Sequence, residues 1–91
     1  MARMLIFPSG KTRKRMRSFL KQHPELEEHA EKVLDVLLGN PLDQTVGAHK
    51  LTGQLRNFYG ADVTPRQYRI VYAFDDRHVY FLNIGTHDEV Y

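Results

Sequence analysis

The side chains best suited to chemistry lie in the last seven residues, Gly85-Thr86-His87-Asp88-Glu89-Val90-Tyr91. His87 carries an imidazole, the one side chain whose ordinary pKa, about 6.5, allows proton transfer near neutral pH. The phenol of Tyr91 can stack on a base or donate a hydrogen bond. A purely structural interpretation is equally open, in which His87 caps a turn while Val90 and Tyr91 pack as an apolar anchor.

Outside this tail the candidate residues are basic. His49 and Lys50 lie in a segment rich in small residues, and Arg69 lies in an alternating strand pattern. Arg56 and Arg66 add to a positive stretch in which Asp62 is the single acid between Gln44 and Phe74. For His49 and Arg69 structural roles remain open: the first would satisfy loop carbonyls, and the second would pair with Asp88 or Glu89.

The candidate residues are histidines, arginines, lysines and a tyrosine, with almost no acidic side chain among them. This combination suits the metal-independent cleavage of a phosphodiester. Attack of a ribose 2′-hydroxyl on the adjacent phosphate needs a base for the hydroxyl and an acid for the departing 5′-oxygen. It also needs cations that stabilise the phosphorane oxygens. RNA fits better than DNA, because DNA lacks this nucleophile.

Metal and cofactor sites are not indicated. The five histidines do not stand at i, i+4, and no carboxylate joins them in a ligand pattern. Glycine-rich phosphate loops, nucleophile elbows and dinucleotide fingerprints are absent from the sequence. We therefore expect neither a metal nor a cofactor.

Length and composition predict one globular domain over residues 1–91. Hydrophobic residues make up 42% of the chain and charged residues 26%, which is ordinary for a folded protein. Cysteine is absent, so nothing suggests an oxidising compartment. The apolar runs are far shorter than the roughly 20 residues of a membrane helix, and no signal peptide is apparent. A cytoplasmic protein without membrane contact is the expectation.

The charges are unevenly placed along the chain. Six cations and no anion lie between Lys11 and Lys21, whereas five anions and one lysine lie between Glu25 and Asp35. Arg13, Lys14 and Arg17 are therefore candidates for contacts with RNA phosphates. The alternative is that the two segments are solvated helix faces that pair with each other.

The apolar spacing predicts an α+β fold. Met4–Phe7 reads as an edge strand, and Met16, Phe19 and Leu20 indicate a helix of about 11 residues. His23-Pro24 breaks this helix and begins a second one, which ends at Gly39.

Three strands are expected to follow the helices. The first is predicted near Leu55–Tyr59, after a loop over residues 40–55. Residues 68–74 alternate, Asp75-Asp76-Arg77 forms a turn, and Val79–Ile84 reads as a central strand buried on both sides. The two-helix hairpin would pack on one face of a small, twisted, mostly antiparallel sheet. Arg69 would lie on the other, uncovered face, with His49, Lys50, Arg56 and the tail at its rim.

Three segments resemble the RelE/ParE superfamily of toxins from toxin–antitoxin pairs. They are His49-Lys50-Leu51-Thr52-Gly53, Tyr68-Arg69-Ile70-Val71-Tyr72 and Ile84-Gly85-Thr86-His87-Asp88-Glu89-Val90-Tyr91. The likeness is to the RelE-like branch with a Gly-Thr-His tail. It extends over the helices, where His23-Pro24-Glu25-Leu26 and Asn40-Pro41 match the helix break and the helix end.

The resemblance implies a RelE-like fold and a ribosome-dependent endoribonuclease that cleaves messenger RNA and is silenced by a cognate antitoxin. It implies that His87 transfers protons, Tyr91 orients the nucleotide, Arg69 contacts the scissile phosphate and His49 is a second acid–base or positioning group. Lys50, Arg56 and Arg66 would bind the RNA backbone. The free toxin is expected to be a monomer.

The sequence departs from the histidine-rich relatives at two positions. Those relatives carry a further histidine and an aspartate before the arginine strand, where this chain has Val63 and Gln67. Two alternatives therefore accompany the enzyme: a ParE-like toxin that inhibits gyrase by binding, and an inactive module that binds only the antitoxin. His87 favours the enzyme over the gyrase inhibitor.

Overall fold

A five-stranded mixed sheet organises the computed structural model, which describes residues 2–91. The strands are β1 (Met4–Ile6), β2 (His49–Lys50), β3 (Tyr59–Thr64), β4 (Tyr68–Phe74) and β5 (His78–Thr86). Their order is β1-β5-β4-β3-β2, with β1 parallel to β5 and every other pair antiparallel. The predicted mostly antiparallel sheet is therefore confirmed.

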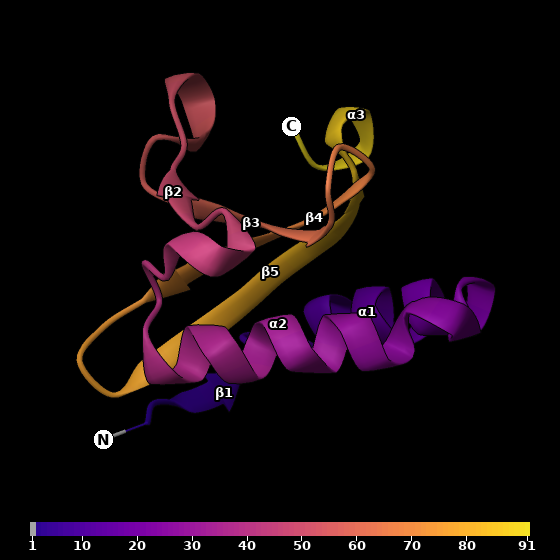
Figure 1. Cartoon of the computed structure of the whole chain (residues 1–91), viewed down its shortest axis with the longest axis horizontal. Helices are drawn as coiled ribbons and strands as arrows, with labels where there is room; N and C mark the ends of the chain where they lie inside the picture. Colours follow the sequence, from indigo (N-terminus) through magenta and orange to yellow (C-terminus); the bar gives the residue numbers. More distant parts are fainter. Residues whose placement is uncertain (1) are drawn as a thin grey trace.

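Two helices lie on one side of this sheet (Figure 1). α1 (Gly10–Gln22) begins at Ser9, whose side chain accepts from the Thr12 amide in a capping box. A 3₁₀ turn, η1 (Pro24–Leu26), connects α1 to α2 (Glu27–Gly39). The helix break at His23-Pro24 lies where the sequence predicts it.

The main core lies between the helices and the sheet. Its fully buried side chains include Leu37 of α2, Tyr72 of β4 and Phe81 of β5. Met16 and Phe19, predicted to form the apolar face of the first helix, are buried in the same cluster. The helical and strand periodicities of the sequence thus identify this core.

The opposite face of the sheet is partly covered rather than bare. Leu51, Val71 and Val90 form a second buried cluster there, with Leu55, Phe58 and Leu82 packed around it. The segment from β2 to β3 and the short helix α3 (His87–Val90) lie on this side (Figure 1). Their side chains border a pocket, so this face is not an open surface.

The strand predicted near Leu55–Tyr59 is wrong in position. Gly53–Leu55 forms a 3₁₀ turn, η3, in which Gly53 has φ +67°, and β3 begins only at Tyr59. Gly60, Ala61 and Asp62 have low strand propensity, which hides β3 in the sequence. His49 and Lys50, expected in a loop, pair with Gly60 and Tyr59 as the edge strand β2.

The predicted strand at Val79–Ile84 is interior, between β1 and β4, and extends over His78–Thr86. Its pairing with β4 shifts between Val71 and Tyr72, which leaves Leu82 as an extra residue. Tyr80, Leu82 and Asn83 are half-buried, so the strand is not buried evenly on both sides. Within residues 2–91, helices stay too short or too polar to cross a bilayer.

Candidate active site

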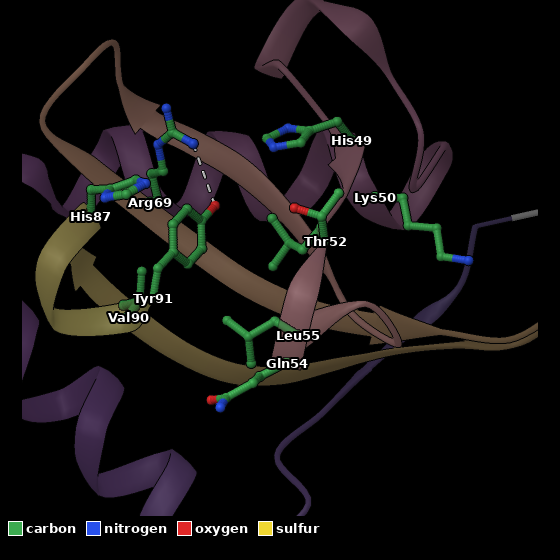
Figure 2. Close-up of a pocket in the computed structure, with 10 residues that line it drawn as sticks. His49, Lys50, Thr52, Gln54, Leu55, Arg69, His87, Val90 and Tyr91 are labelled. Carbon is green, nitrogen blue, oxygen red and sulfur yellow. Dashed lines mark hydrogen bonds between the residues drawn. The ribbon is translucent and has the colours of Figure 1, made fainter.

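A pocket of about 590 Å³ lies on the sheet face away from α1 and α2. Its walls come from β2 and η3 on one side and from β4 and α3 on the other (Figure 2). It is lined by His49, Lys50, Leu51, Thr52, Gln54, Leu55, Arg69, His87, Val90 and Tyr91. Segments far apart in the sequence thus bring two imidazoles, a guanidinium and a phenol into one hollow.

The short helix α3 presents His87 and Tyr91 to this pocket. Thr86 begins the helix with a capping box: its hydroxyl accepts from the Glu89 amide, and Glu89 accepts from the Thr86 amide. Residues four apart lie on one helix face. The His87 and Tyr91 rings accordingly meet edge to face, with centroids 4.5 Å apart. Thr86, and not His87, is therefore the capping residue.

Arg69 lies between Tyr91 and Asp62. Its Nη1 donates to the Tyr91 hydroxyl at 3.4 Å, and its guanidinium carbon lies 5.5 Å from the centre of that ring. Its Nε lies 3.4 Å from Asp62 Oδ1 on the neighbouring strand β3. The hydrogen bond to Tyr91 and, less strongly, the charge of Asp62 raise the pKa of Arg69.

The alternative in which Arg69 pairs with Asp88 or Glu89 is wrong. Glu89 pairs with Arg15 of α1 instead, and Arg69 pairs across β3 and β4 with Asp62. Asp62 engages the Nε edge, and one terminal nitrogen of Arg69, Nη1, is directed toward the Tyr91 hydroxyl (Figure 2). Asp62 is a site residue that the sequence did not single out, although its isolation among cations was visible.

Gly60 makes room for the Tyr91 hydroxyl. A Cβ at this buried position of β3 would clash with the hydroxyl and would approach Leu51 Cδ2 to 3.1 Å. It would also lie 3.6 Å from His49 Cε1. The Tyr91 hydroxyl is thus close to the β2–β3 backbone, between His49 on one side and His87 on the other.

His49 projects from β2 with a defined tautomer. Its Nδ1 lies 2.8 Å from the carbonyl oxygen of Gly47, which can only accept a hydrogen bond. Nδ1 therefore carries the proton in the neutral ring, and Nε2 keeps a free lone pair. The loop-carbonyl role and an acid–base role are compatible, since they use different nitrogens.

The other predicted binding residues do not all reach this pocket. Lys50 lines it, but its side chain extends away from the cluster (Figure 2). Arg56 follows η3 and donates to the Gly53 carbonyl at 3.4 Å. Arg66 is exposed in the β3–β4 turn, where it adopts φ +66°. These last two are outside the pocket lining.

Arg13, Lys14 and Arg17 lie on α1, on the other side of the sheet from the pocket (Figure 1). Together with Lys21 they border a shallow hollow on the helix surface. The Arg13 guanidinium lies 5.1 Å from the centre of the Phe7 ring. These cations form a separate positive surface.

Val63 and Gln67 do not stand in the pocket. Val63 is buried in the main core on the helix side of β3, and Gln67 is exposed in the β3–β4 turn. A histidine at position 63 with this backbone would face the helices. Over residues 2–91 the side chains form no cluster of three or more histidines and acids placed to hold a metal ion.

Comparison with solved structures identifies the fold. YafQ from Escherichia coli superposes with a TM-score of 0.78 at 22% identity, covering 98% of both chains. The toxin of the E. coli DinJ–YafQ complex gives a TM-score of 0.78 at 22% identity, over 100% of this chain and 99% of that one. The YoeB dimer from Staphylococcus aureus gives 0.76 at 19% identity, over 96% and 99%.

No curated protein sequence matches the chain. A family model does, however, and it describes the bacterial toxin YafQ of type II toxin–antitoxin systems. It matches residues 4–91, which include every strand and helix described above. The resemblance to toxins of toxin–antitoxin pairs and the RelE-like fold are thereby confirmed. The chain belongs to the YafQ family of toxins of type II toxin–antitoxin systems.

Proposed function

We propose that this toxin is a ribosome-dependent endoribonuclease that cleaves messenger RNA without a metal. The observation that carries the proposal is the meeting of His49, Arg69, His87 and Tyr91 in one pocket. The family supports it, because YafQ toxins are ribonucleases. The same four residues are the ones to which the sequence assigns chemical roles.

Arg69 and Tyr91 would hold the scissile phosphate and its nucleotide. The guanidinium offers several N–H donors in a planar fork, which matches phosphate oxygens. Asp62 holds its Nε side at 3.4 Å, so the terminal nitrogens are oriented before substrate binds. The Tyr91 ring, with 39% of the residue exposed, offers a stacking surface and a hydroxyl.

His49 and His87 would move the protons. His49 Nε2 would accept the proton of the 2′-hydroxyl as its oxygen bonds to phosphorus. His87 would donate a proton to the 5′-oxygen as the P–O5′ bond breaks. The products are a 2′,3′-cyclic phosphate and a 5′-hydroxyl, and the two imidazoles end with their protonation states exchanged. The Tyr91 side chain between the rings would separate the base from the acid.

A cognate antitoxin is the proposed second partner. The E. coli relative is seen in a DinJ–YafQ complex and the S. aureus relative in a YoeB–YefM complex. We propose that this toxin also binds a cognate antitoxin, that the antitoxin holds it inactive, and that the free form is a monomer in the cytoplasm, where ribosomes lie.

The chemistry of the cut ends tests the proposal. Messenger bound to ribosomes is treated with the toxin, with and without excess chelator, and both new ends are mapped. Cleavage that persists in chelator and leaves a cyclic or 3′-phosphate with a 5′-hydroxyl is expected. Ends of the opposite kind would indicate a metal-activated water instead. Intact messenger with inhibited gyrase supercoiling would support a protein that acts by binding.

A further inference from the structure

We propose that Arg15 is a positioning residue that holds α3, and with it His87 and Tyr91, against α1. The inference rests on the proposed function, because it concerns how the two α3 side chains are kept in the pocket. Arg15 lies on the side of α1 that reaches the C-terminal half of β5. Arg15 is neither part of the tail motif nor a residue that lines the pocket.

Arg15 bridges two acceptors on different segments. Its Nε donates to Asn83 Oδ1 at 2.9 Å, and its Nη2 donates to Glu89 Oε2 at 3.3 Å. One acceptor belongs to the sheet and the other to α3, so a single guanidinium connects α1, β5 and α3. The side chain is 34% exposed and that of Glu89 51%, so water competes for this contact.

The β-bulge in β5 explains why Asn83 is available. β1 pairs only with His78–Tyr80, which leaves the edge of β5 beyond Tyr80 open toward α1. The extra residue Leu82 shifts the pairing at this point, and the Asn83 side chain caps the open edge by accepting from the Ile84 amide. The same oxygen then accepts from Arg15.

Gly85 allows the guanidinium to approach the backbone. A Cβ on Gly85 would lie 2.8 Å from Arg15 Nη2 and 3.1 Å from Glu89 Oε1. The glycine of the Gly-Thr-His tail thus gives space to the bridge rather than to a turn. Arg15 and Glu89 lie over it, close to the first residue of α3.

Glu89 joins this bridge to the start of α3. Its Oε1 accepts from the Thr86 amide at 2.9 Å, while Oε2 accepts from Arg15. The bonds to Thr86, followed by those to Arg15, lower the pKa of Glu89. The carboxylate that caps α3 is therefore also the one that anchors it to α1.

The bridge matters because α3 is too short to hold itself. The free-energy cost of nucleating a helix exceeds what the hydrogen bonds of a four-residue helix contribute. Val90 is the one buried side chain of α3, so packing adds little. The rings of His87 and Tyr91 lie at its two ends, so a small rotation of α3 displaces both. Misplacing catalytic groups by about 1 Å can cost up to about a hundredfold in rate.

Two substitutions with opposite charge changes test the bridge. Arg15→Ala removes a positive charge and Glu89→Gln removes a negative one, so their effects on RNA attraction have opposite signs. We expect both to lower kcat for ribosome-bound messenger by about two- to fivefold, with KM unchanged, which corresponds to the strength of a partly exposed ion pair. Glu31→Gln, on the exposed face of α2, makes the same charge change as Glu89→Gln and should leave kcat unchanged.

A raised KM with unchanged kcat in Arg15→Ala, together with full activity in Glu89→Gln, would overturn the proposal and make Arg15 an RNA ligand. Amide hydrogen exchange provides a readout that needs no cleavage. The Glu89 and Tyr91 amides, bonded to Thr86 Oγ1 and the His87 carbonyl, should exchange faster in both variants, while β4 amides keep their protection. Unchanged exchange at both amides would also overturn it, whether or not the wild-type toxin cuts messenger.

Discussion

His87 is exposed at the pocket mouth, so its chemical and structural contributions can be separated. Its side chain is 64% exposed and its contacts are the Tyr91 ring and, at 3.7 Å, Asp88 Oδ1. His87→Ala should lower the cleavage rate by about 10²- to 10⁴-fold, the usual contribution of a general acid or base. The free energy of unfolding should change by no more than about 0.5 kcal/mol, as is usual at an exposed position. Single-turnover cleavage and a thermal melt measure the two effects, and full activity in a folded variant would exclude proton transfer by His87.

Arg69 contributes geometry as well as charge. Its guanidinium reaches Tyr91 with Nη1 and Asp62 with Nε, which a single lysine ammonium cannot do at once. Arg69→Ala should abolish cleavage, and Arg69→Lys should restore only a small part of it.

Comparing the two Arg69 variants with Asp62→Asn shows whether the geometry or only the charge of Arg69 is needed for cleavage. The asparagine removes the charge behind Nε but keeps the shape, so we expect activity between that of the wild type and Arg69→Lys. Cleavage by Arg69→Lys equal to that of the wild type would show that a point charge is sufficient.

At the scale of elements, β3 controls where Tyr91 lies. The Tyr91 hydroxyl occupies the space that a side chain at position 60 would fill. Gly60→Ala should displace the hydroxyl from Arg69. We expect the cleavage rate to fall by about tenfold, because a group that orients the substrate is then misplaced. Because Tyr91 is partly exposed and can swing outward, the fold should persist.

Pairing Gly60→Ala with Tyr91→Phe distinguishes displacement from a general defect. If the alanine acts only through the hydroxyl, it should add little to the defect already caused by the phenylalanine. Independent defects that multiply in the double variant would mean that Gly60 acts on β2 or Leu51 instead.

The elements differ in how well the sequence predicts them. The helices and β4 have clear apolar periodicity, and their buried residues are those expected from it. β3 lacks a recognisable strand pattern, because Gly60 and Asp62 have low strand propensity and serve the pocket instead. The sequence therefore predicts this strand several residues too early, near Leu55–Tyr59. Asp62 and Gly60 lie beside Arg69 and His49 because of the register between β3 and its neighbours. No local pattern in the sequence specifies that register.

The two-sided role of α1 could not be predicted either. The sequence shows a positive helix, but it gives no sign that Arg15 turns away from the other cations toward Asn83 and Glu89. That separation follows from the open edge of β5 and from the bulge at Leu82. Arg69, His87 and Tyr91 could be found from the sequence, because Arg69 interrupts an alternating apolar strand and the other two follow the apolar strand that ends at Ile84.

At the scale of the whole molecule, Tyr72 links the sheet to the end of α2. Its side chain is fully buried and its hydroxyl donates to the Pro41 carbonyl. Tyr72→Phe should lower the free energy of unfolding by about 1–3 kcal/mol, because the buried carbonyl loses its donor. Urea unfolding at neutral pH measures this difference, and an unchanged midpoint would mean that water replaces the hydroxyl.

The same residue should make stability depend on alkaline pH. Burial raises the pKa of the Tyr72 phenol well above its ordinary value of about 10. Above pH 10 the unfolded chain releases this proton while the folded protein retains it, so the free energy of unfolding should fall as pH rises. Tyr72→Phe should remove part of that slope. The hydrogen bond to Asp75 also raises the pKa of Tyr80. Tyr80 is present in both proteins, so the slope that remains in Tyr72→Phe includes its contribution.

The charge distribution divides the molecule into two surfaces on opposite sides of the sheet. The pocket carries the chemistry, whereas Arg13, Lys14 and Arg17 lie on α1, far from the proposed proton transfers. Phosphate contacts position a protein on RNA without specifying sequence, so this surface should act in docking rather than in cleavage.

Replacing Arg13, Lys14 and Arg17 by glutamine should therefore weaken ribosome association and leave the single-turnover rate at saturating ribosomes unchanged. Each RNA phosphate that the variant no longer neutralises should flatten the dependence of log affinity on log salt by about 0.7–0.9, so the slope should fall by roughly 2–3. Association measured across a salt series gives the slope. As a control, the pair Arg13→Gln and Arg17→Gln is compared with Lys32→Gln and Arg77→Gln, which change the net charge equally elsewhere. Equal slopes for the two pairs would mean that α1 is a solvated face, and that its positive charge acts only through the net charge of the protein.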